Sequence, residues 1–268
     1  MATFSCLRAV MLDWAGTTVD HGSRAPVLAM KALFLRHGVA LRDAQVRQEM
    51  GLLKRDHIRA ILAQPEVATA WQMAGGDPSG EAVVEQLFAE FGPMQMEIIQ
   101  EHSGLIEGVV PAVRQWQAEG LRIGTTTGYT RRMLAPVMEG AAAGGYVPEA
   151  SVSADEVIAG RPAPWMLLRN MEQLGVYPPR ACVKIGDTLS DVEEGKNAGM
   201  WTIGLTRSGN MVGLDASAWE QLPAAEQQRM LAEADSAMRA AGADFTAETL
   251  RECDAILRRI DEQLATEK

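Results

Sequence analysis

Short apolar runs recur along the chain, and each is followed by Gly, Asp or Thr and then by an amphipathic segment. This alternation is typical of β-strands that feed helices in a parallel sheet, because such strands are covered on both faces. The runs predict strands at 7–12, 121–125, 181–185 and 201–205, with a weaker one at 150–152, and the intervening segments predict helices at 131–138, 165–174 and 190–198. We therefore expect an α/β fold with a doubly wound, Rossmann-like parallel sheet.

The strand pattern stops between the first run and residue 121. Apolar spacing in this region predicts consecutive helices at 26–37, 43–62, 81–91 and 94–102, with a turn at Gly75–Pro78 and a return linker at 104–111. We expect an all-helical insertion at 21–104 inside an α/β core made of residues 1–20 and 105–268. The C-terminal third is rich in Ala and Glu and predicts helices, with a last strand near 243–245.

The composition narrows the class of protein. A length of 268 residues with 47% hydrophobic and 22% charged residues suits a globular protein with a sizeable core. The formal charge of −10, from 25 Lys and Arg against 35 Asp and Glu, disfavours a broad nucleic-acid-binding surface. Any phosphate site in so acidic a chain should be compact and local.

The three cysteines, Cys6, Cys182 and Cys253, are odd in number, far apart and without CxxC spacing, and no signal peptide precedes them. This usage favours a reduced, cytoplasmic protein. The longest apolar stretches fall far short of the roughly 20 residues that a membrane span requires, so we expect no membrane partner.

Acidic residues follow two of the predicted strands, where ligands collect in a doubly wound sheet. Asp13 opens a Gly-Thr turn and suits a nucleophile or a metal ligand, although a helix cap is the alternative for a lone Asp. Asp187 and Asp191 lie four residues apart at a strand-to-helix junction, so both can face the same edge of the sheet. Together with Asp13 they predict an acidic Mg²⁺ cluster, a role that is compatible with helix capping.

Two further segments suit the binding of an anion. Thr127 and Gly128 end the second strand with a hydroxyl and a flexible turn, which fit phosphoryl oxygens, although threonine is also a common strand residue. Arg161 lies in a loop stiffened by Pro162 and Pro164, just before a predicted helix.

Taken in order, these four segments resemble the motifs of the haloacid dehalogenase superfamily. The family pattern is a nucleophilic Asp, a Ser or Thr, a Lys or Arg, and an acidic Mg²⁺ pair. The resemblance covers residues 3–20 and about 105–207, and the insertion after the first motif is similar to the C1-type helical cap of that superfamily. One position departs from the pattern: most phosphatases of the superfamily carry a second Asp two residues after the nucleophile, where this chain has Ala15.

The missing acid draws attention to the segment from Met50 to His57 in the predicted cap. Met50, Lys54 and His57 are spaced i, i+4 and i+7, which predicts one face of a helix. A lysine that faces a carbonyl can form a Schiff base, whereas most lysines on amphipathic helices are simply exposed. The Asp-x-Ala-Gly-Thr-Thr and Met-Gly-x-x-Lys-x-x-His segments together resemble the phosphonatase family.

That resemblance implies hydrolysis of the C–P bond of phosphonoacetaldehyde to acetaldehyde and phosphate. Asp13 would form an aspartyl phosphate, and an imine on Lys54 would receive the departing electrons as an enamine, so no acid beside Asp13 is needed. The resemblance places Mg²⁺ on Asp13, the Ala15 carbonyl and Asp187, with Asp191 supporting the metal.

The remaining site residues follow from the same resemblance. The implied catalytic residues are Asp13, Lys54, His57, Thr127 and Arg161, and the implied substrate-binding residues are Met50, Gly51, Thr127, Gly128, Tyr129 and Arg161. His57 would move protons or hold a water, and burial under the cap should lower the pKa of Lys54.

Family resemblance also implies a homodimer and a place in 2-aminoethylphosphonate catabolism, after the transaminase that makes the aldehyde. The main alternative is a Mg²⁺-dependent phosphatase that acts on a small phosphate ester, against which Ala15 weighs. Haloacid dehalogenation, with attack at carbon, would give Asp187 and Asp191 less purpose. A non-catalytic sensor of phosphorylated ligands is supported by Ala15 alone, and the intact Asp13, Arg161 and Asp187 argue against it.

Overall fold

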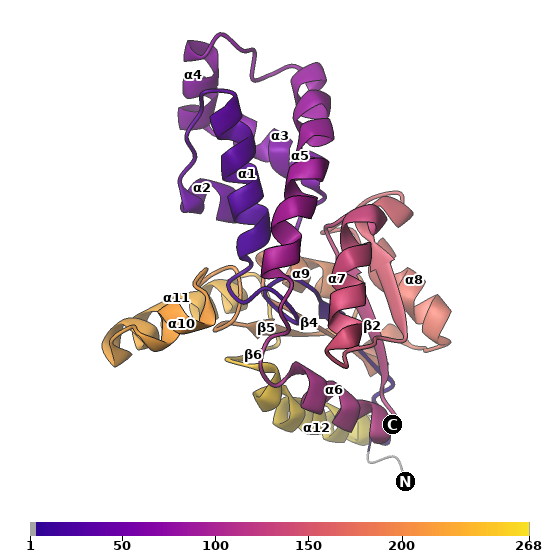
Figure 1. The fold of residues 1–268 in the computed structure, drawn as a ribbon. Helices are drawn as coiled ribbons and strands as arrows, with labels where there is room; N and C mark the ends of the chain where they lie inside the picture. The colour runs from indigo at the N-terminus through magenta and orange to yellow at the C-terminus, as the bar shows by residue number, and fades with distance from the viewer. Residues whose placement is uncertain (1–3, 268) are drawn as a thin grey trace.

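The computed structural model describes residues 4–267 and places six strands in one parallel sheet (Figure 1). The strands are β1 (Ala9–Asp13), β2 (Arg122–Thr127), β3 (Ala150–Ser153), β4 (Cys182–Gly186), β5 (Trp201–Leu205) and β6 (Phe245–Ala247). Their order in the sheet is β3-β2-β1-β4-β5-β6. The chain therefore winds outward in both directions from β1, which is the doubly wound arrangement expected from the sequence, and the carboxyl ends of β1, β2 and β4 adjoin.

Helices cover both faces of the sheet. One face carries α6 (Val109–Ala118), α7 (Arg131–Ala143) and α12 (Leu250–Thr266), and the other carries α8 (Trp165–Leu174), α9 (Leu189–Asn197) and α11 (Ala224–Ala240). The short elements α10 (Ala216–Glu220), η1 (Ala154–Glu156) and η2 (Pro179–Ala181) complete the core. Alternate residues of β1 serve the two faces: Met11 packs with α8, whereas Val10 and Leu12 join the cluster that contains α6 and α12.

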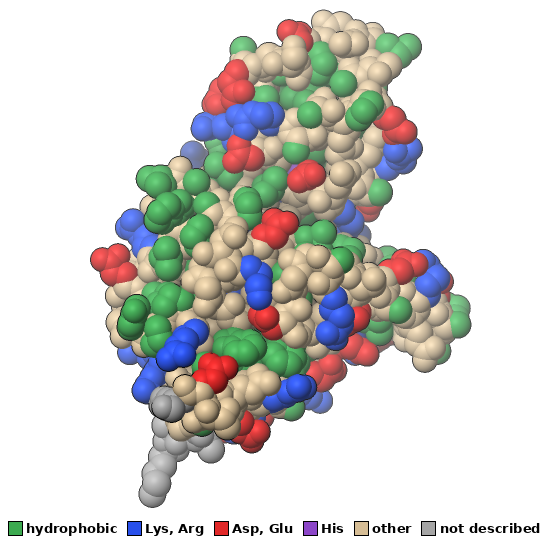
Figure 2. Space-filling model, turned by 180° about the vertical axis from the view of Figure 1, so that it is seen from behind, with side chains coloured by type: hydrophobic (Ala, Val, Ile, Leu, Met, Phe, Trp, Pro, Cys, Tyr) green, Lys and Arg blue, Asp and Glu red, His purple; other side chains and the backbone are tan. Residues whose placement is uncertain are grey.

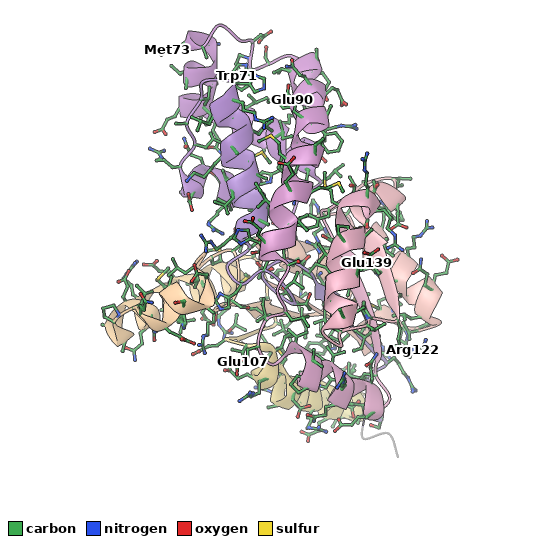
Figure 3. All side chains as sticks on the ribbon, viewed as in Figure 1. Trp71, Met73, Glu90, Glu107, Arg122 and Glu139 are labelled. Carbon is green, nitrogen blue, oxygen red and sulfur yellow. The ribbon has the colours of Figure 1, made fainter. Side chains whose placement is uncertain are left out.

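The helical insertion follows β1 and stands beyond the carboxyl edge of the sheet (Figure 1). It comprises α1 (Arg24–Arg36), α2 (Asp43–Arg47), α3 (Lys54–Ala63), α4 (Pro65–Met73) and α5 (Glu81–His102). Trp71 and Met73 lie at the end farthest from the sheet (Figure 3). At the near end the Asp20 N–H donates to the Gly104 carbonyl at 3.0 Å, so the outgoing and returning segments are joined where they meet the core.

The insertion differs from its sequence prediction in how the helices are divided. Segment 43–62 is not one helix, because the chain turns between α2 and α3 and Gly51 has a φ of +93° there. The prediction that Met50 shares a helical face with Lys54 and His57 is therefore wrong, since Met50 precedes the helix that Lys54 begins. Conversely, segments 81–91 and 94–102 form a single helix, α5.

Tertiary packing explains these differences. Helix α5 continues through Pro93, although proline costs a backbone hydrogen bond in a helix interior, because buried residues on both sides of it pack in the main hydrophobic cluster. Helix α4, which the apolar spacing does not predict, starts with Pro65 in its first turn. The last strand begins at Phe245, two residues later than predicted.

The surface in Figure 2 shows basic and acidic side chains interspersed rather than gathered by sign. None of the helices in the described part of the chain has the length and apolar character needed to cross a membrane. Cys6, Cys182 and Cys253 are buried free thiols, in agreement with the reduced state expected from their spacing.

A carboxylate on the last helix ties the start of the chain to the core. Asp261 accepts hydrogen bonds from the backbone N–H groups of Ser5 at 2.9 Å, Cys6 at 2.7 Å and Leu7 at 2.7 Å. Burial opposes ionisation of Asp261, but these donors outweigh it and hold its pKa below the ordinary value. The ionised carboxylate therefore stabilises the entry into β1.

Replacing Asp261 with Asn should lower the free energy of unfolding at pH 7 by about 2 kcal/mol, because three N–H donors lose a charged acceptor. The pKa is lower in the folded than in the unfolded protein, so the full contribution is present above about pH 4 and is lost as the pH falls through the folded value. Urea unfolding at pH 7 and pH 3 measures it, with the exposed Glu139→Gln as control. A difference from wild type that is equal at both pH values would contradict the prediction.

Candidate active site

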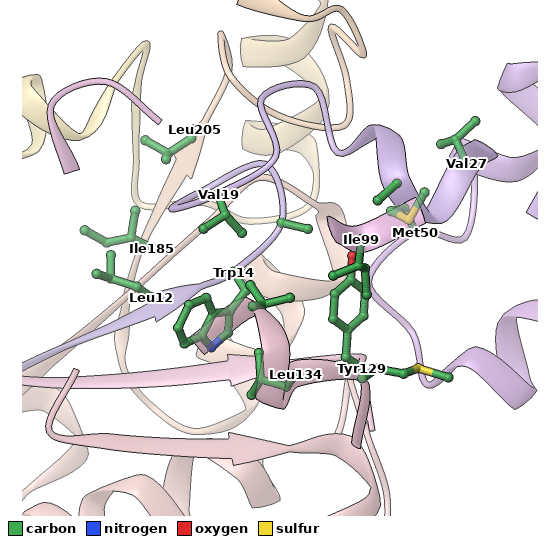
Figure 4. Close-up of a cluster of buried hydrophobic side chains, with 14 of the residues drawn as sticks. Leu12, Trp14, Val19, Val27, Met50, Ile99, Tyr129, Leu134, Ile185 and Leu205 are labelled. Carbon is green, nitrogen blue, oxygen red and sulfur yellow. The ribbon is translucent and has the colours of Figure 1, made fainter. Parts of the chain in front are cut away.

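The nucleophile loop is held by the packing of the residue after Asp13. Trp14 is fully buried, contacts Tyr146 edge to face with ring centroids 5.4 Å apart, and lies between Leu12 and Leu134 in Figure 4. The Trp14 carbonyl accepts the N–H groups of the turn that follows, which closes the loop. Asp13 therefore ends β1 at the centre of the carboxyl edge.

Gly16 allows the loop to approach Asp187. Its φ is +89°, and a Cβ atom at this position would lie 2.2 Å from Asp187 Oδ2. The next residue, Thr17, donates its hydroxyl to Asp187 Oδ1 at 3.0 Å. The Asp-x-Ala-Gly-Thr-Thr segment thus supplies both the nucleophile candidate and a support for a second carboxylate.

Three carboxylates meet at this edge. Asp13, Asp187 and Asp191 are buried, and each offers an oxygen atom within 4.8 Å of the others. Thr188 caps α9 by accepting the Asp191 N–H, while the Asp191 carboxylate accepts the Thr188 N–H at 3.1 Å. Asp191 therefore combines the capping role and the site role that its spacing predicts.

Two buried cations neutralise part of this charge. Arg161 pairs with Asp13 at 2.7 Å, with Asp191 at 3.0 Å and with Glu194 at 2.9 Å. Lys184 pairs with Asp191 at 2.8 Å and with Glu194 at 3.5 Å. The side chains are almost fully enclosed, so these ion pairs are little screened by solvent.

The sequence analysis missed Lys184, Glu194 and Thr126. The Thr126 hydroxyl accepts from Arg161 at 2.7 Å and from Lys184 at 2.8 Å, and donates to Glu194 at 3.1 Å. A signal was present for Lys184, which is a charged residue in an otherwise apolar strand. Glu194 carries a weaker one, because it lies one helical turn after Asp191.

The charges of the site do not balance within the protein. Asp13, Asp187, Asp191 and Glu194 face only two paired cations, and among the described residues no basic group lies within salt-bridge distance of Asp187. Burial and the charges of Asp13 and Asp191 raise the pKa of Asp187 well above its usual value. A divalent cation would supply the missing charge, and this oxygen-rich donor set fits Mg²⁺.

The other carboxylates respond to the same field in opposite directions. Burial and the charge of Asp191 raise the pKa of Asp13, although Arg161 and Lys184 oppose this. Burial also disfavours ionisation of Asp191, but its two cationic partners outweigh burial and lower its pKa. Asp191 is therefore the carboxylate that the protein itself holds ionised.

The insertion meets the core through α5, which packs on α7, and through the turn between α2 and α3. The Ser190 hydroxyl donates to the Met50 carbonyl at 3.2 Å, and a Cβ atom at Gly51 would lie 2.2 Å from Ser190 Oγ. On the other side, a Cβ atom at Gly128 would lie 2.6 Å from the Leu52 carbonyl oxygen. Gly51 and Gly128 thus permit a close backbone approach that shuts the insertion over the carboxyl edge.

Lys54 begins α3 directly after this turn and is 2% exposed. Its Nζ lies 4.0 Å from Met50 Sδ and 5.6 Å from the centroid of the Tyr129 ring. Burial lowers the pKa of Lys54 to about 8, and Arg161 adds to this effect while Asp13 opposes it. The lowered pKa agrees with the expectation from the sequence.

Tyr129 and His57 enclose the lysine. Tyr129 is buried, follows the Thr127 hydroxyl that accepts its N–H at 3.1 Å, and points toward Met50 and Ile99 of the insertion in Figure 4. His57 Nε2 lies 2.7 Å from the Val46 carbonyl oxygen and so carries the proton, which leaves Nδ1 as an acceptor. Burial and Lys54 lower the pKa of His57 to about 3, so the ring is neutral.

Comparison with known proteins agrees with this arrangement. The sequence model of the haloacid dehalogenase-like hydrolases matches residues 7–199. Phosphonoacetaldehyde hydrolases from Bacillus thuringiensis and Syntrophobacter fumaroxidans are 39% and 41% identical over 96% and 97% of this chain, and the matches span 97% and 94% of those proteins. A phosphonoacetaldehyde hydrolase-like protein from Oleispira antarctica has a crystal structure with a TM-score of 0.97 at 37% identity, covering 98% of this chain and 96% of that one. The chain therefore belongs to the haloacid dehalogenase-like hydrolases, in the family of the phosphonoacetaldehyde hydrolases, and is an enzyme of the hydrolase class.

Proposed function

We propose that this enzyme hydrolyses the C–P bond of phosphonoacetaldehyde to acetaldehyde and phosphate, with Mg²⁺, through a Schiff base on Lys54 and an aspartyl phosphate on Asp13. The observation that carries the proposal is the state of Lys54, a buried lysine with no carboxylate within salt-bridge distance among the described residues. The names of its relatives support the substrate.

The two buried lysines of the site differ in the way this chemistry requires. Lys184 is held by Asp191 and Glu194, so its positive charge is compensated. Lys54 faces a thioether and an aromatic ring instead, neither of which compensates a full charge. An amine with a lowered pKa is a nucleophile at neutral pH, and a carbonyl group is the natural acceptor for it.

Asp13 supplies the second nucleophile. Arg161 holds one oxygen of its carboxylate at 2.7 Å, which orients the group at the end of β1. Ala15 places no acid two residues away, where an alkoxide leaving group would need a proton. A carbon leaving group whose electrons enter an iminium needs no such acid at this point, so Lys54 and Ala15 are consistent with each other.

The proposed reaction begins with the amine of Lys54 and ends with hydrolysis of the aspartyl phosphate. Lys54 Nζ adds to the aldehyde carbon, and loss of water leaves an iminium. An Asp13 oxygen attacks phosphorus, the C–P bond breaks, and its electron pair forms the enamine C=C bond. Protonation of the enamine carbon and hydrolysis of the resulting iminium release acetaldehyde and Lys54. Water then cleaves the aspartyl phosphate to phosphate and Asp13.

Other residues bind and orient the substrate in this proposal. Asp13 and Asp187 would hold Mg²⁺ with the Ala15 carbonyl, supported by Asp191, and the ion would neutralise charge on the phosphoryl oxygens. Thr127 and Arg161 would contact those oxygens, while Met50, Gly51, Gly128 and Tyr129 enclose the substrate. His57 Nδ1, a buried acceptor without a partner among the described residues, would accept a proton during imine formation.

The wider setting is proposed from the family resemblance. We infer a cytoplasmic homodimer that acts in organic phosphonate catabolism, downstream of the transamination of 2-aminoethylphosphonate. In each subunit, residues 21–104 would form the cap, and residues 1–20 and 105–268 would form the core. The alternative function is hydrolysis of a small phosphate ester, which would use Asp13, Arg161 and the acidic cluster but leave Lys54 without a role.

Treatment with phosphonoacetaldehyde and borohydride should inactivate the enzyme and place a reduced adduct on Lys54, as mapped by peptide mass spectrometry. Lys54→Arg should fold but lose at least about 1,000-fold in turnover, because a guanidinium cannot form the imine. Lys31→Arg, which changes the exposed lysine of the insertion, is the matched control. Near-normal turnover by Lys54→Arg, or hydrolysis of simple phosphate esters without an adduct, would favour the phosphatase.

The rate of adduct formation should rise with pH, because the neutral form of the Lys54 amine is the nucleophile. Below about 8, the pKa of Lys54, protonation removes the nucleophile and the initial rate falls as the pH is lowered. Above that value the rate should level off. The measurement is the initial trapping rate from pH 6 to 10, and a profile that rises only near pH 10.5 would show an exposed, ordinary lysine.

Asp187→Asn should separate metal binding from folding. The protein without metal should be as stable as wild type or more so, because the raised pKa of Asp187 shows that burying this carboxyl costs stability when no cation balances it. The rise in melting temperature on adding Mg²⁺ should be lost, and the Mg²⁺ concentration for half-maximal activity should rise at least about ten-fold. Calorimetric titration with Mg²⁺ checks this, and unchanged Mg²⁺ affinity would contradict the assignment of the site.

A further inference from the structure

The loop after β5 lies between the acidic cluster and the helical insertion. The Asn210 N–H donates to Asp187 Oδ2 at 2.8 Å, and a Cβ atom at Gly209 would lie 2.2 Å from Asp187 Cβ. The loop backbone is therefore pressed against the carboxylate. The opposite side of the same loop faces Arg47, the last residue of α2.

Arg47 binds this loop through several hydrogen bonds of its guanidinium group, which together are called the clasp. It donates to the Gly22 carbonyl at 2.9 Å, to the Gly213 carbonyl at 3.0 Å, and to the backbone and side-chain oxygens of Asn210 at 3.3 and 3.2 Å. In return, Asn210 Nδ2 donates to the Arg47 carbonyl at 3.0 Å. Among the described residues no carboxylate lies within 4.0 Å of the guanidinium, so the contact depends on backbone shape rather than on an ion pair.

The backbone on the loop side of the clasp has no room for a side chain. A Cβ atom at Gly213 would lie 2.6 Å from Arg47 Cζ, and the φ of Gly213 is +71°. Beside the clasp, a cavity of about 750 Å³ lies between the insertion and the core and is lined by Arg47, Met50 and Ser190. The hydrogen bonds of Arg47 therefore connect the insertion to the core next to a cavity, where the two are otherwise incompletely packed.

Arg47 is also close in the chain to the groups that enclose Lys54. The carbonyl of its neighbour Val46 accepts a hydrogen bond from His57 Nε2 at 2.7 Å, and the Met50 N–H donates to the Arg47 carbonyl at 3.2 Å. The Met50 sulfur in turn contacts Lys54, and the Met50 carbonyl accepts a hydrogen bond from the Ser190 hydroxyl. A shift of Arg47 would therefore move the whole turn that leads to Lys54.

We propose that Arg47 is a positioning residue, whose clasp on the Asn210–Gly213 loop sets Lys54 over Asp13 and joins the seating of the insertion to the loop that orients Asp187. The proposal deepens the proposed function and rests on it for the reacting groups. Arg47 touches neither the substrate nor the reacting atoms in this proposal. Its effect is exerted through the turn on one side and through Asn210 on the other.

Two variants disrupt the clasp from opposite sides. Arg47→Met removes the guanidinium and keeps the aliphatic stem, while Gly213→Ala places a methyl group against it. Gly175→Ala is the matched control for the second, because Gly175 has a φ of +64° with no atom within 4 Å of a Cβ there. Arg42→Met, at the other end of α2, controls for loss of a cation.

The first readout is independent of turnover. Reductive methylation by formaldehyde and cyanoborohydride, without substrate, reports the accessibility of Lys54, and Lys184 in the core serves as the internal monitor of unfolding. Arg47→Met and Gly213→Ala should each raise the labelling rate of Lys54 about ten-fold and leave Lys184 protected, because exposure then follows local opening. Both controls should label as wild type does.

The second readout is steady-state kinetics with phosphonoacetaldehyde. The two clasp variants should lower kcat about 10- to 100-fold with little change in KM, since misplacing a reacting group costs rate more than binding. Arg47→Lys, which can reach fewer of the carbonyls, should lie between. Protected Lys54 with normal kcat in both variants, or equal labelling of Lys184, would overturn the proposal. Absence of turnover in wild type would instead reject the proposed function, and the labelling result would stand separately.

Discussion

The structure of the site depends on an imbalance of charge. Four buried carboxylates meet only two buried cations at the carboxyl edge of the sheet. Arg161 and Lys184 are shared between Asp191 and Glu194, and the Thr126 hydroxyl joins Arg161, Lys184 and Glu194. Within the described part of the chain, Asp187 has no cation within salt-bridge distance. Such a cluster is costly to bury unless its charge is compensated, so it is a place where a divalent cation and a phosphoryl group can be bound together.

Lys54 is unusual because it is a buried lysine without a counter-charge, and the comparison with Lys184 shows the difference. Both side chains are almost completely enclosed, but of the two only Lys184 has carboxylate partners among residues 4–267. Removing counter-charges from a buried lysine favours the neutral amine, which is the form that attacks a carbonyl. The absence of a carboxyl at Ala15 fits the same chemistry, because an iminium accepts the electrons that an acid would otherwise help to remove.

The insertion delivers Lys54 through backbone contacts. Glycines at the contacts, Gly51, Gly128 and Gly213, allow main chain or guanidinium to lie where a Cβ atom would collide. Arg47 donates a hydrogen bond to the loop that supports Asp187, and the Ser190 hydroxyl donates to the turn before Lys54. The proposed reaction requires two reactive groups to be brought together from the insertion and the core, and close backbone approach does this without adding charge to an acidic site.

The sequence by itself determined the parallel sheet and the helical insertion, because buried strands leave continuous apolar runs. It also predicted Asp13, Thr127 and Asp187 as candidate site residues, because they stand at the ends of those runs, and Arg161 from its place in a loop with two prolines. Local pattern could not divide 43–62 into two helices or keep α5 whole through Pro93, since contacts with the core and within the insertion decided both. Lys184, Glu194 and Asn210 entered the site only through tertiary structure. Their roles depend on partners distant along the chain, and no spacing rule within one segment records which buried charges will meet.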